Sequence, residues 1–132
     1  MKLKVLIVDD DEVFIMVNTM MVKRSTVSEE PIGFDSGKKA LDYIEENKDL
    51  DESYLIFLDI NMPVMSGWDF LESLKNKNYS KEIYIVILTS SIDLSDHIKA
   101  KSYNLVIDFV EKILTLDACL RLKQMRQISK FY

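Results

Sequence analysis

The sequence of 132 residues has few of the residues that disulfides, zinc sites and membrane spans require. The single cysteine, Cys119, excludes an internal disulfide, and we interpret it as a small core residue of a cytoplasmic protein. The single histidine, His97, argues against a zinc site, and we expect it to be solvated on the surface. The longest apolar runs are far shorter than the roughly 18 residues of a membrane span, so we expect no membrane association. Nothing at the start of the chain reads as a secretory signal.

Basic residues are also in the minority. Seventeen Lys and Arg residues stand against 22 Asp and Glu, which gives a formal net charge of −5. Proteins that bind phosphate backbones normally carry a basic face, so the composition argues against nucleic acid as a direct partner. Two prolines and three glycines form no stretch that resembles a linker. With 48% hydrophobic residues, the chain is expected to form one domain over residues 1–132.

Five short apolar runs recur along the chain, at residues 3–8, 32–34, 54–58, 83–88 and 105–110. They are continuous rather than alternating, which is typical of strands that are covered on both faces. The segments between them have helical spacing, residues 116–128 have a helical composition, and Ser66 with Asp69 fits a helix capping box. This alternation predicts an α/β doubly wound fold, with a five-stranded parallel sheet, right-handed crossovers and helices on both faces.

Polar side chains follow four of the five runs. Asp9 and Asp10 follow the first, Asp59 follows the third, Thr89 the fourth, and Lys112 comes shortly after the fifth. In open parallel sheets the ligand site lies beyond the carboxyl ends of the strands, so we expect these side chains to converge there. Two units of a strand and a helix separate Asp9 from Asp59, whereas one unit separates Asp59 from Thr89 and one separates Thr89 from Lys112. The second strand lies within the first gap and therefore contributes nothing to the site.

Three carboxylates on one rim repel each other, by about 4 kcal/mol for a pair 4 Å apart at an effective dielectric of 20. A cation must offset this repulsion. Hard oxygen ligands in small number suit magnesium, whereas zinc prefers His or Cys. Asp59, Thr89 and Lys112 would add a nucleophilic carboxylate, a hydroxyl donor and a fixed ammonium, a set that suits a phosphoryl group.

Several other residues have structural interpretations. Asp11 and Glu12 are typical of the first turn of a helix, where the dipole favours acids, rather than of metal ligands. Met16, Met20 and Met21 are interpreted as packing residues of the first helical segment. The four acids of "VLIVDDDE" therefore divide into two for the site and two for the helix start.

The segments "VLIVDDDE" (5–12), "LIFLDINMPVMSG" (55–67), "VILTSS" (86–91) and "DFVEK" (108–112) occur in this order. Together with "GKKAL" at residues 37–41, they resemble the receiver domain of bacterial two-component response regulators, a group that includes the chemotaxis response regulators. The resemblance covers essentially the whole chain. It implies a flavodoxin-like strand order 2-1-3-4-5 and a stand-alone receiver with no separate output domain.

The resemblance also implies roles for the polar residues. Asp59 would be the phosphoacceptor, taking a phosphoryl group from a phosphohistidine of a sensor histidine kinase or a histidine phosphotransfer protein. Magnesium would be held by Asp10, by Asp9 through water, by Asp59 and by the backbone carbonyl of Asn61. Lys112 and Thr89 would bind the phosphoryl oxygens.

A switch is implied as well. Thr89 and Phe109 would change position together when the phosphoryl group is bound, and the surface of the fourth helix, fifth strand and fifth helix would bind an unidentified downstream protein. Asn61 and Ser91 are small and polar at positions that tune dephosphorylation, so we expect modest self-dephosphorylation. The protein would catalyse only its own phosphorylation from phosphohistidine and its slow self-dephosphorylation. We expect it to be a monomer or a weak dimer.

One position departs from the family pattern. Ile113 follows Lys112 where the family has a proline with a cis peptide bond. A cis bond before a non-proline residue costs about 3–4 kcal/mol, so we expect a trans bond that aims Lys112 differently. Two alternatives stay open: an interaction module that works without phosphorylation, and a metal-dependent phosphatase, which would need a second acid where Asn61 stands.

Overall fold

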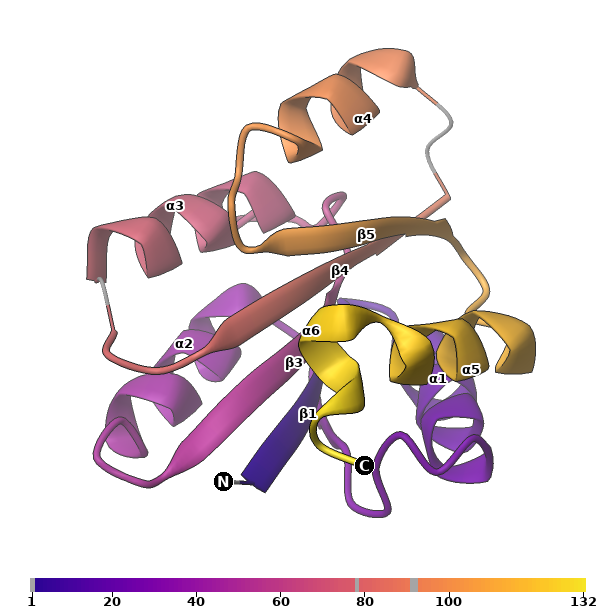
Figure 1. Cartoon of the computed structure of the whole chain (residues 1–132). Coiled ribbons are helices and arrows are strands. Elements are labelled where there is room, and N and C mark those ends of the chain that lie inside the picture. Colours follow the sequence, from indigo (N-terminus) through magenta and orange to yellow (C-terminus); the bar gives the residue numbers. More distant parts are fainter. Residues whose placement is uncertain (1, 78, 91–92) are drawn as a thin grey trace.

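The computed structural model describes residues 2–77, 79–90 and 93–132. Strands and helices alternate along the chain, as Figure 1 shows. The elements are β1 (Lys2–Val8), α1 (Glu12–Arg24), β2 (Ile32–Phe34), α2 (Gly37–Glu46), β3 (Glu52–Leu58), α3 (Gly67–Lys77), β4 (Ile83–Thr89), α4 (Leu94–Ala100), β5 (Val106–Glu111), α5 (Leu116–Gln124) and α6 (Arg126–Ser129). In the described part of the chain, no helix is long and apolar enough to span a membrane.

The five strands form one parallel sheet in the order β2-β1-β3-β4-β5. The central strands are buried on both faces; Val5, Leu6 and Ile7, for example, are almost completely inaccessible. This is why the apolar runs are continuous rather than alternating. The predicted fold class and strand order are confirmed.

The two faces of the sheet carry separate layers of helices (Figure 1). On one face, residues of α2, α3 and α4 pack against alternate strand residues, with Ile44 and Phe70 fully buried. On the other face, α1, α5 and α6 cover the remaining strand residues, with Val22, Cys119 and Ile128 fully buried. The core role predicted for Cys119 is confirmed, and burial raises the pKa of its thiol.

The predicted helix starts are largely confirmed. Ser66 and Asp69 form the reciprocal capping box of α3, in which each backbone N–H donates to the other side chain. Asp11 caps α1 by accepting from the N–H of Val13, and Glu12 lies in the first turn. Asp11 and Glu12 therefore serve the start of α1, as predicted.

Two predictions about helices are wrong. Met16 and Met20 do not pack in the core: 58% and 51% of their surfaces are exposed, because α1 turns the side of Asn18 and Val22 toward the sheet. The last helix also ends earlier than predicted, since Met125 has an extended conformation that separates α5 from α6. This break lets Ile128 turn inward to the core.

Candidate functional site

The site lies where the carboxyl ends of β1, β3 and β4 meet the segment after β5. The sheet register brings these ends together, because Val8 pairs with Leu58 and Thr89 pairs with Glu111. The ladder continues one residue past β3, where the N–H of Asp59 donates to the carbonyl of Val8 at 3.0 Å. Side chains that are 50 residues apart in sequence, 9 and 59, therefore become neighbours.

Asp9, Asp10 and Asp59 form an acidic cluster in which each carboxylate offers an oxygen within 4.8 Å of the others. Asp9 and Asp59 are buried, whereas Asp10 is exposed. Asp9 accepts the N–H of Asp11 at 2.9 Å, and Asp59 accepts the N–H of Asn61 at 3.1 Å. Two of the acids are thus fixed and the third faces solvent.

Three carboxylates that converge from two chain segments are hard oxygen ligands, and no His or Cys belongs to this cluster of described residues. Such a set fits magnesium, which is usually bound through carboxylates and keeps several waters. Asp9, Asp10 and Asp59 would hold it. The further ligand expected from the backbone carbonyl of Asn61 stays a prediction.

Lys112 supplies the positive charge of the site. Its Nζ lies 2.8 Å from Asp9 Oδ2 and 3.2 Å from Asp59 Oδ2, and it sits 4.3 Å from the centre of the Phe14 ring. Burial by itself would lower the pKa of Lys112, but the hydrogen bond to Asp9 and the charges of Asp59 and Asp9 raise it above its ordinary value. The ammonium is therefore a permanent charge at neutral pH.

Asp59 has the opposite balance. Burial raises the pKa of its carboxyl above the ordinary 3.8, although the hydrogen bond from Asn61 and the charge of Lys112 act in the other direction. The nearby carboxylate of Asp9 raises this pKa further. Negative charge on Asp59 is therefore held at a cost in free energy, and a group that neutralises or shares this charge would be favoured.

The segment after β5 differs from the prediction. The peptide bond between Lys112 and Ile113 is cis, so the expected trans bond is wrong. The different aim expected for Lys112 is not found either, because its position is set by the ion pairs to two buried carboxylates. Its N–H also donates to the carbonyl of Thr89 at 2.9 Å, which continues the pairing of β5 with β4.

Thr89 is buried at the end of β4, and its hydroxyl accepts a hydrogen bond from the side-chain amide of Asn61 at 3.2 Å. Asn61 therefore bridges the ends of β3 and β4 through its backbone and its side chain. Sequence reasoning placed Asn61 in the site but gave no signal for this bridge. Ser91, the second predicted tuning residue, lies outside the described residues.

Phe109 and Thr89 project from the same face of the sheet, because Ile87 pairs with Phe109, Thr89 pairs with Glu111, and side chains alternate along strands. His97 stacks on Phe109, with ring centroids 3.7 Å apart and an interplanar angle of 30°. The expected solvated position of His97 is therefore wrong, because its imidazole is half-buried and packs on the ring of Phe109. A lone histidine in a weak helical pattern gave no signal for this contact.

The loop after Asp59 leads into α3 through Gly67. A Cβ at Gly67 would lie 2.6 Å from the carbonyl oxygen of Asp59 and 2.6 Å from Cα of Ile60. Only glycine allows the start of α3 to approach the backbone of Asp59 this closely. The glycine of the "MPVMSG" segment thus fixes the loop that carries the acid.

Comparison with known proteins agrees with this geometry. Residues 5–122 match the family described as response regulator receiver domain. The chain is 34% identical over 86 residues to the two-component response regulator ORR7 of Oryza sativa subsp. japonica, covering 65% of this chain and 39% of that protein. It is 29% identical over 107 residues to the response regulator Rcp1 of Synechocystis, covering 79% of this chain and 71% of that protein.

A solved structure is also similar. The crystal structure of a two-component response regulator from Cytophaga hutchinsonii superimposes with a TM-score of 0.86, at 28% identity and with 98% of each chain covered. The match thus extends over the sheet, the helices and the segments that carry Asp9, Asp59 and Lys112. The chain belongs to the response regulator receiver domain family.

Proposed function

We propose that this protein is a phosphoryl-accepting signalling module in which Asp59 is the phosphoacceptor. The observation that carries the proposal is the ion triad of Lys112 with the buried carboxylates of Asp9 and Asp59. Among the three acids, Asp59 is the one that Asn61 links to the buried hydroxyl of Thr89: the N–H of Asn61 donates to Asp59 and its side-chain amide donates to Thr89. Membership of the receiver family supports a histidine kinase or a histidine phosphotransfer protein as the donor.

In the proposed reaction, a carboxylate oxygen of Asp59 attacks the phosphorus of a phosphohistidine. A P–O bond to Asp59 forms as the P–N bond breaks, and the imidazole leaves with a proton from solvent. Lys112 stays beside Asp59 and pairs with the phosphoryl oxygens, while the hydroxyl of Thr89 donates to one of them. Magnesium, when bound at the three acids, would neutralise charge on the transferring group.

The surface around the site supports a protein donor. Val13 and Met16 on α1 and Ile113 after Lys112 are exposed apolar side chains on the segments that flank the acids. The N–H of Leu114 donates to Oδ1 of Asn18 at 3.4 Å, so the segment after Lys112 is tied to α1. We infer that this apolar rim is covered when the donor brings its histidine to Asp59.

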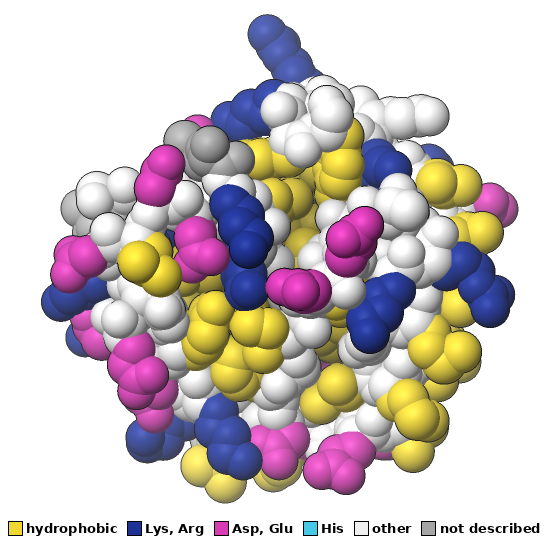
Figure 2. All heavy atoms as spheres, turned by 90° about the horizontal axis from the view of Figure 1, so that it is seen from below, with side chains coloured by type: hydrophobic (Ala, Val, Ile, Leu, Met, Phe, Trp, Pro, Cys, Tyr) yellow, Lys and Arg dark blue, Asp and Glu magenta, His cyan; other side chains and the backbone are white. Residues whose placement is uncertain are grey.

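Charge distribution supports a protein rather than a nucleic acid as partner. On the face that Figure 2 shows, Lys and Arg side chains are interspersed with Asp and Glu and with hydrophobic side chains. A surface that follows a phosphate backbone would gather its basic residues. Among the residues that the structure describes, this face shows no such gathering of basic residues, and the net charge of −5 also argues against a phosphate backbone as partner.

After phosphorylation, Thr89 is expected to move toward the phosphoryl oxygens and Phe109 to follow into the space that opens. These movements would change the surface formed by α4, β5 and α5, and the changed surface would bind the downstream target. Asn61 is small and polar and is exposed beside Asp59, so it would leave room for water to attack the acyl phosphate. The phosphoryl group is therefore expected to be lost by modest self-dephosphorylation.

Incubation with acetyl phosphate and MgCl2, followed by intact mass measurement, tests the proposal. The expected result is one added phosphoryl group on the wild type and none on Asp59→Asn. Asp51→Asn is the control, because Asp51 is an exposed acid that directly precedes β3, at the opposite end of the strand from Asp59. This variant should be labelled like the wild type. Label on Asp59→Asn would contradict the assignment of the acceptor, and an unlabelled wild type would favour the interaction module that works without phosphorylation.

A further inference from the structure

The stacking of His97 on Phe109 is the feature that the proposed function does not use. Of the ring pairs found in the described part of the chain, this one has the shortest centroid separation, 3.7 Å. The two rings come from different elements, since His97 belongs to α4 and Phe109 to β5. They form a direct contact between the sheet face that carries Thr89 and a helix on the surface.

The helix α4 has a small inner side and an apolar outer side. Ala100 is its buried residue, while Leu94 and Ile98, one turn apart, are 71% and 62% exposed. Figure 1 shows α4 at the margin of the fold, beyond the edge strand β5. A helix with little buried side-chain volume can shift at low cost in free energy, so the few contacts on its inner side decide its position.

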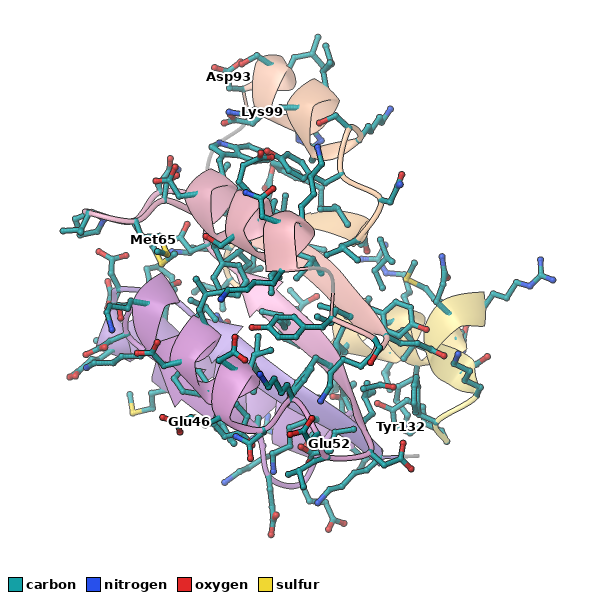
Figure 3. All side chains as sticks on the ribbon, turned by 90° about the vertical axis from the view of Figure 1, so that its left-hand side faces the viewer. Glu46, Glu52, Met65, Asp93, Lys99 and Tyr132 are labelled. Carbon is teal, nitrogen blue, oxygen red and sulfur yellow. The ribbon has the colours of Figure 1, made fainter. Side chains whose placement is uncertain are left out.

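On the side toward α3, α4 meets the only tryptophan of the chain. Lys99 Nζ lies 4.7 Å from the centre of the Trp68 ring, and the ring of Tyr103 stacks on Trp68 at 6.0 Å. Figure 3 shows Lys99 on the side of α4 that faces α3. On one side α4 contacts Trp68, whose fluorescence can report a movement of the helix. On the other side α4 contacts Phe109 through His97.

We propose that His97 is a positioning residue that couples the ring of Phe109 to α4. This inference rests on the proposed function, in which Thr89 and Phe109 move together. The Phe109 ring lies against the imidazole, so its movement either separates the two rings or shifts α4 with its exposed Leu94 and Ile98. A stacked aromatic pair changes the balance between two such conformations by about two- to tenfold, enough to couple the helix to the ring.

The chemistry of His97 does not require a particular charge for this role. Either face of an imidazole can stack on a phenyl ring, so an aromatic residue of similar size should replace it. His97→Phe is therefore the conservative variant, and His97→Ala removes the stacking surface. Ile98→Ala is the matched control, because Ile98 is the next residue on the same helix and its side chain is exposed.

The experiment measures amide hydrogen exchange of residues 94–101 and Trp68 fluorescence, with and without acetyl phosphate and MgCl2. The mass of each protein measures phosphorylation of Asp59 in the same samples. We expect the wild type, His97→Phe and Ile98→Ala to change in both signals, and His97→Ala to lose at least half of the change while it is phosphorylated to the same extent.

The outcomes separate the two proposals. A full change of α4 and Trp68 in phosphorylated His97→Ala would overturn the coupling role of His97. The same conclusion would follow if phosphorylated wild type showed no change in α4, or if His97→Phe behaved like His97→Ala. Failure of the wild type to take up the phosphoryl group would instead overturn the proposed function.

Discussion

Replacing Lys112 by methionine should destabilise the protein strongly when divalent cations are removed. Methionine keeps most of the length and apolar volume of lysine but removes the charge. The ammonium is 2.8 Å from one carboxylate and 3.2 Å from the other, and only 9% of its side chain is exposed. Without it, Asp9 and Asp59 would face each other in a buried site with no compensating cation.

The size of the effect follows from burial. Breaking a buried ion pair by removing one partner costs about 3–5 kcal/mol, because the remaining charge is buried and unpaired. Partial protonation of Asp59 would relieve some of this cost, so we expect a loss of about 3 kcal/mol in the free energy of unfolding at pH 7. With a urea dependence of about 1–3 kcal/mol per molar, the unfolding midpoint should fall by roughly 1–3 M.

Urea unfolding followed by Trp68 fluorescence in EDTA measures this loss. Lys39→Met is the matched control: Lys39 Nζ also lies 2.8 Å from a carboxylate, Asp35 Oδ1, but its side chain is 64% exposed. Its removal should leave the midpoint almost unchanged, because solvent screens an exposed pair. A Lys112→Met midpoint equal to that of the wild type, or an equal loss for both variants, would refute the argument that burial makes this charge essential.

Three further predictions concern stability. In EDTA, Asp59→Asn should stabilise the protein by about 1–2 kcal/mol at pH 7, because it removes one of two buried carboxylates that repel each other while Lys112 keeps its ion pair with Asp9. The folded-state pKa of Asp59 is above its ordinary 3.8, so the cost of the carboxylate disappears as the pH falls through the raised value. The stabilisation should shrink accordingly in melts at decreasing pH, and a constant gain would contradict this account. Magnesium at 100 times its dissociation constant should add about 2.7 kcal/mol to wild-type stability but little to Asp10→Asn, which should match the wild type in EDTA because Asp10 is exposed; an equal magnesium effect in both would remove Asp10 from the site. Tyr54→Phe should be neutral or stabilising by about 1 kcal/mol, because the buried Tyr54 hydroxyl has no hydrogen-bond partner among the described residues. Burial raises the pKa of Tyr54 from 10.0 to about 12, so the folded protein keeps this proton longer than the unfolded chain and loses stability as the pH rises between these values. Alkaline unfolding of Tyr54→Phe should lack that part of the loss, and identical curves for both proteins would contradict the assignment.

The fold was predictable because burial leaves a direct trace in the sequence. A strand that is covered on both faces must be apolar without interruption, as in β3, where Leu55 faces one helix layer and Ile56 the other, and such strands end where polar residues begin. Asp9, Asp59 and Lys112 could be assigned to one site for the same reason, since parallel strands bring their carboxyl ends to one edge. Here sequence position and spatial position are linked by a simple rule.

The remaining features depend on orientation, which has no such trace. A methionine at a helical position such as Met20 is compatible with core or surface, and only the packed position of α1 decides between them. The contact of His97 with Phe109 joins two elements whose relative rotation the sequence does not express. The amide of Asn61 reaches Thr89 through a loop conformation that depends on the close approach at Gly67.

The exposed thioethers of Met16 and Met20 make the outer side of α1 sensitive to oxidants. Peroxide would convert accessible thioethers to sulfoxides and turn an apolar stripe of α1 polar, without altering a carboxylate or Lys112. Oxidised protein should still accept phosphoryl groups from acetyl phosphate but lose transfer from a protein donor that covers α1. The oxidation state of these two methionines would therefore determine whether a preparation retains both activities or only the reaction with acetyl phosphate. Methionine sulfoxide reductases reverse this oxidation and should restore the transfer from the protein donor.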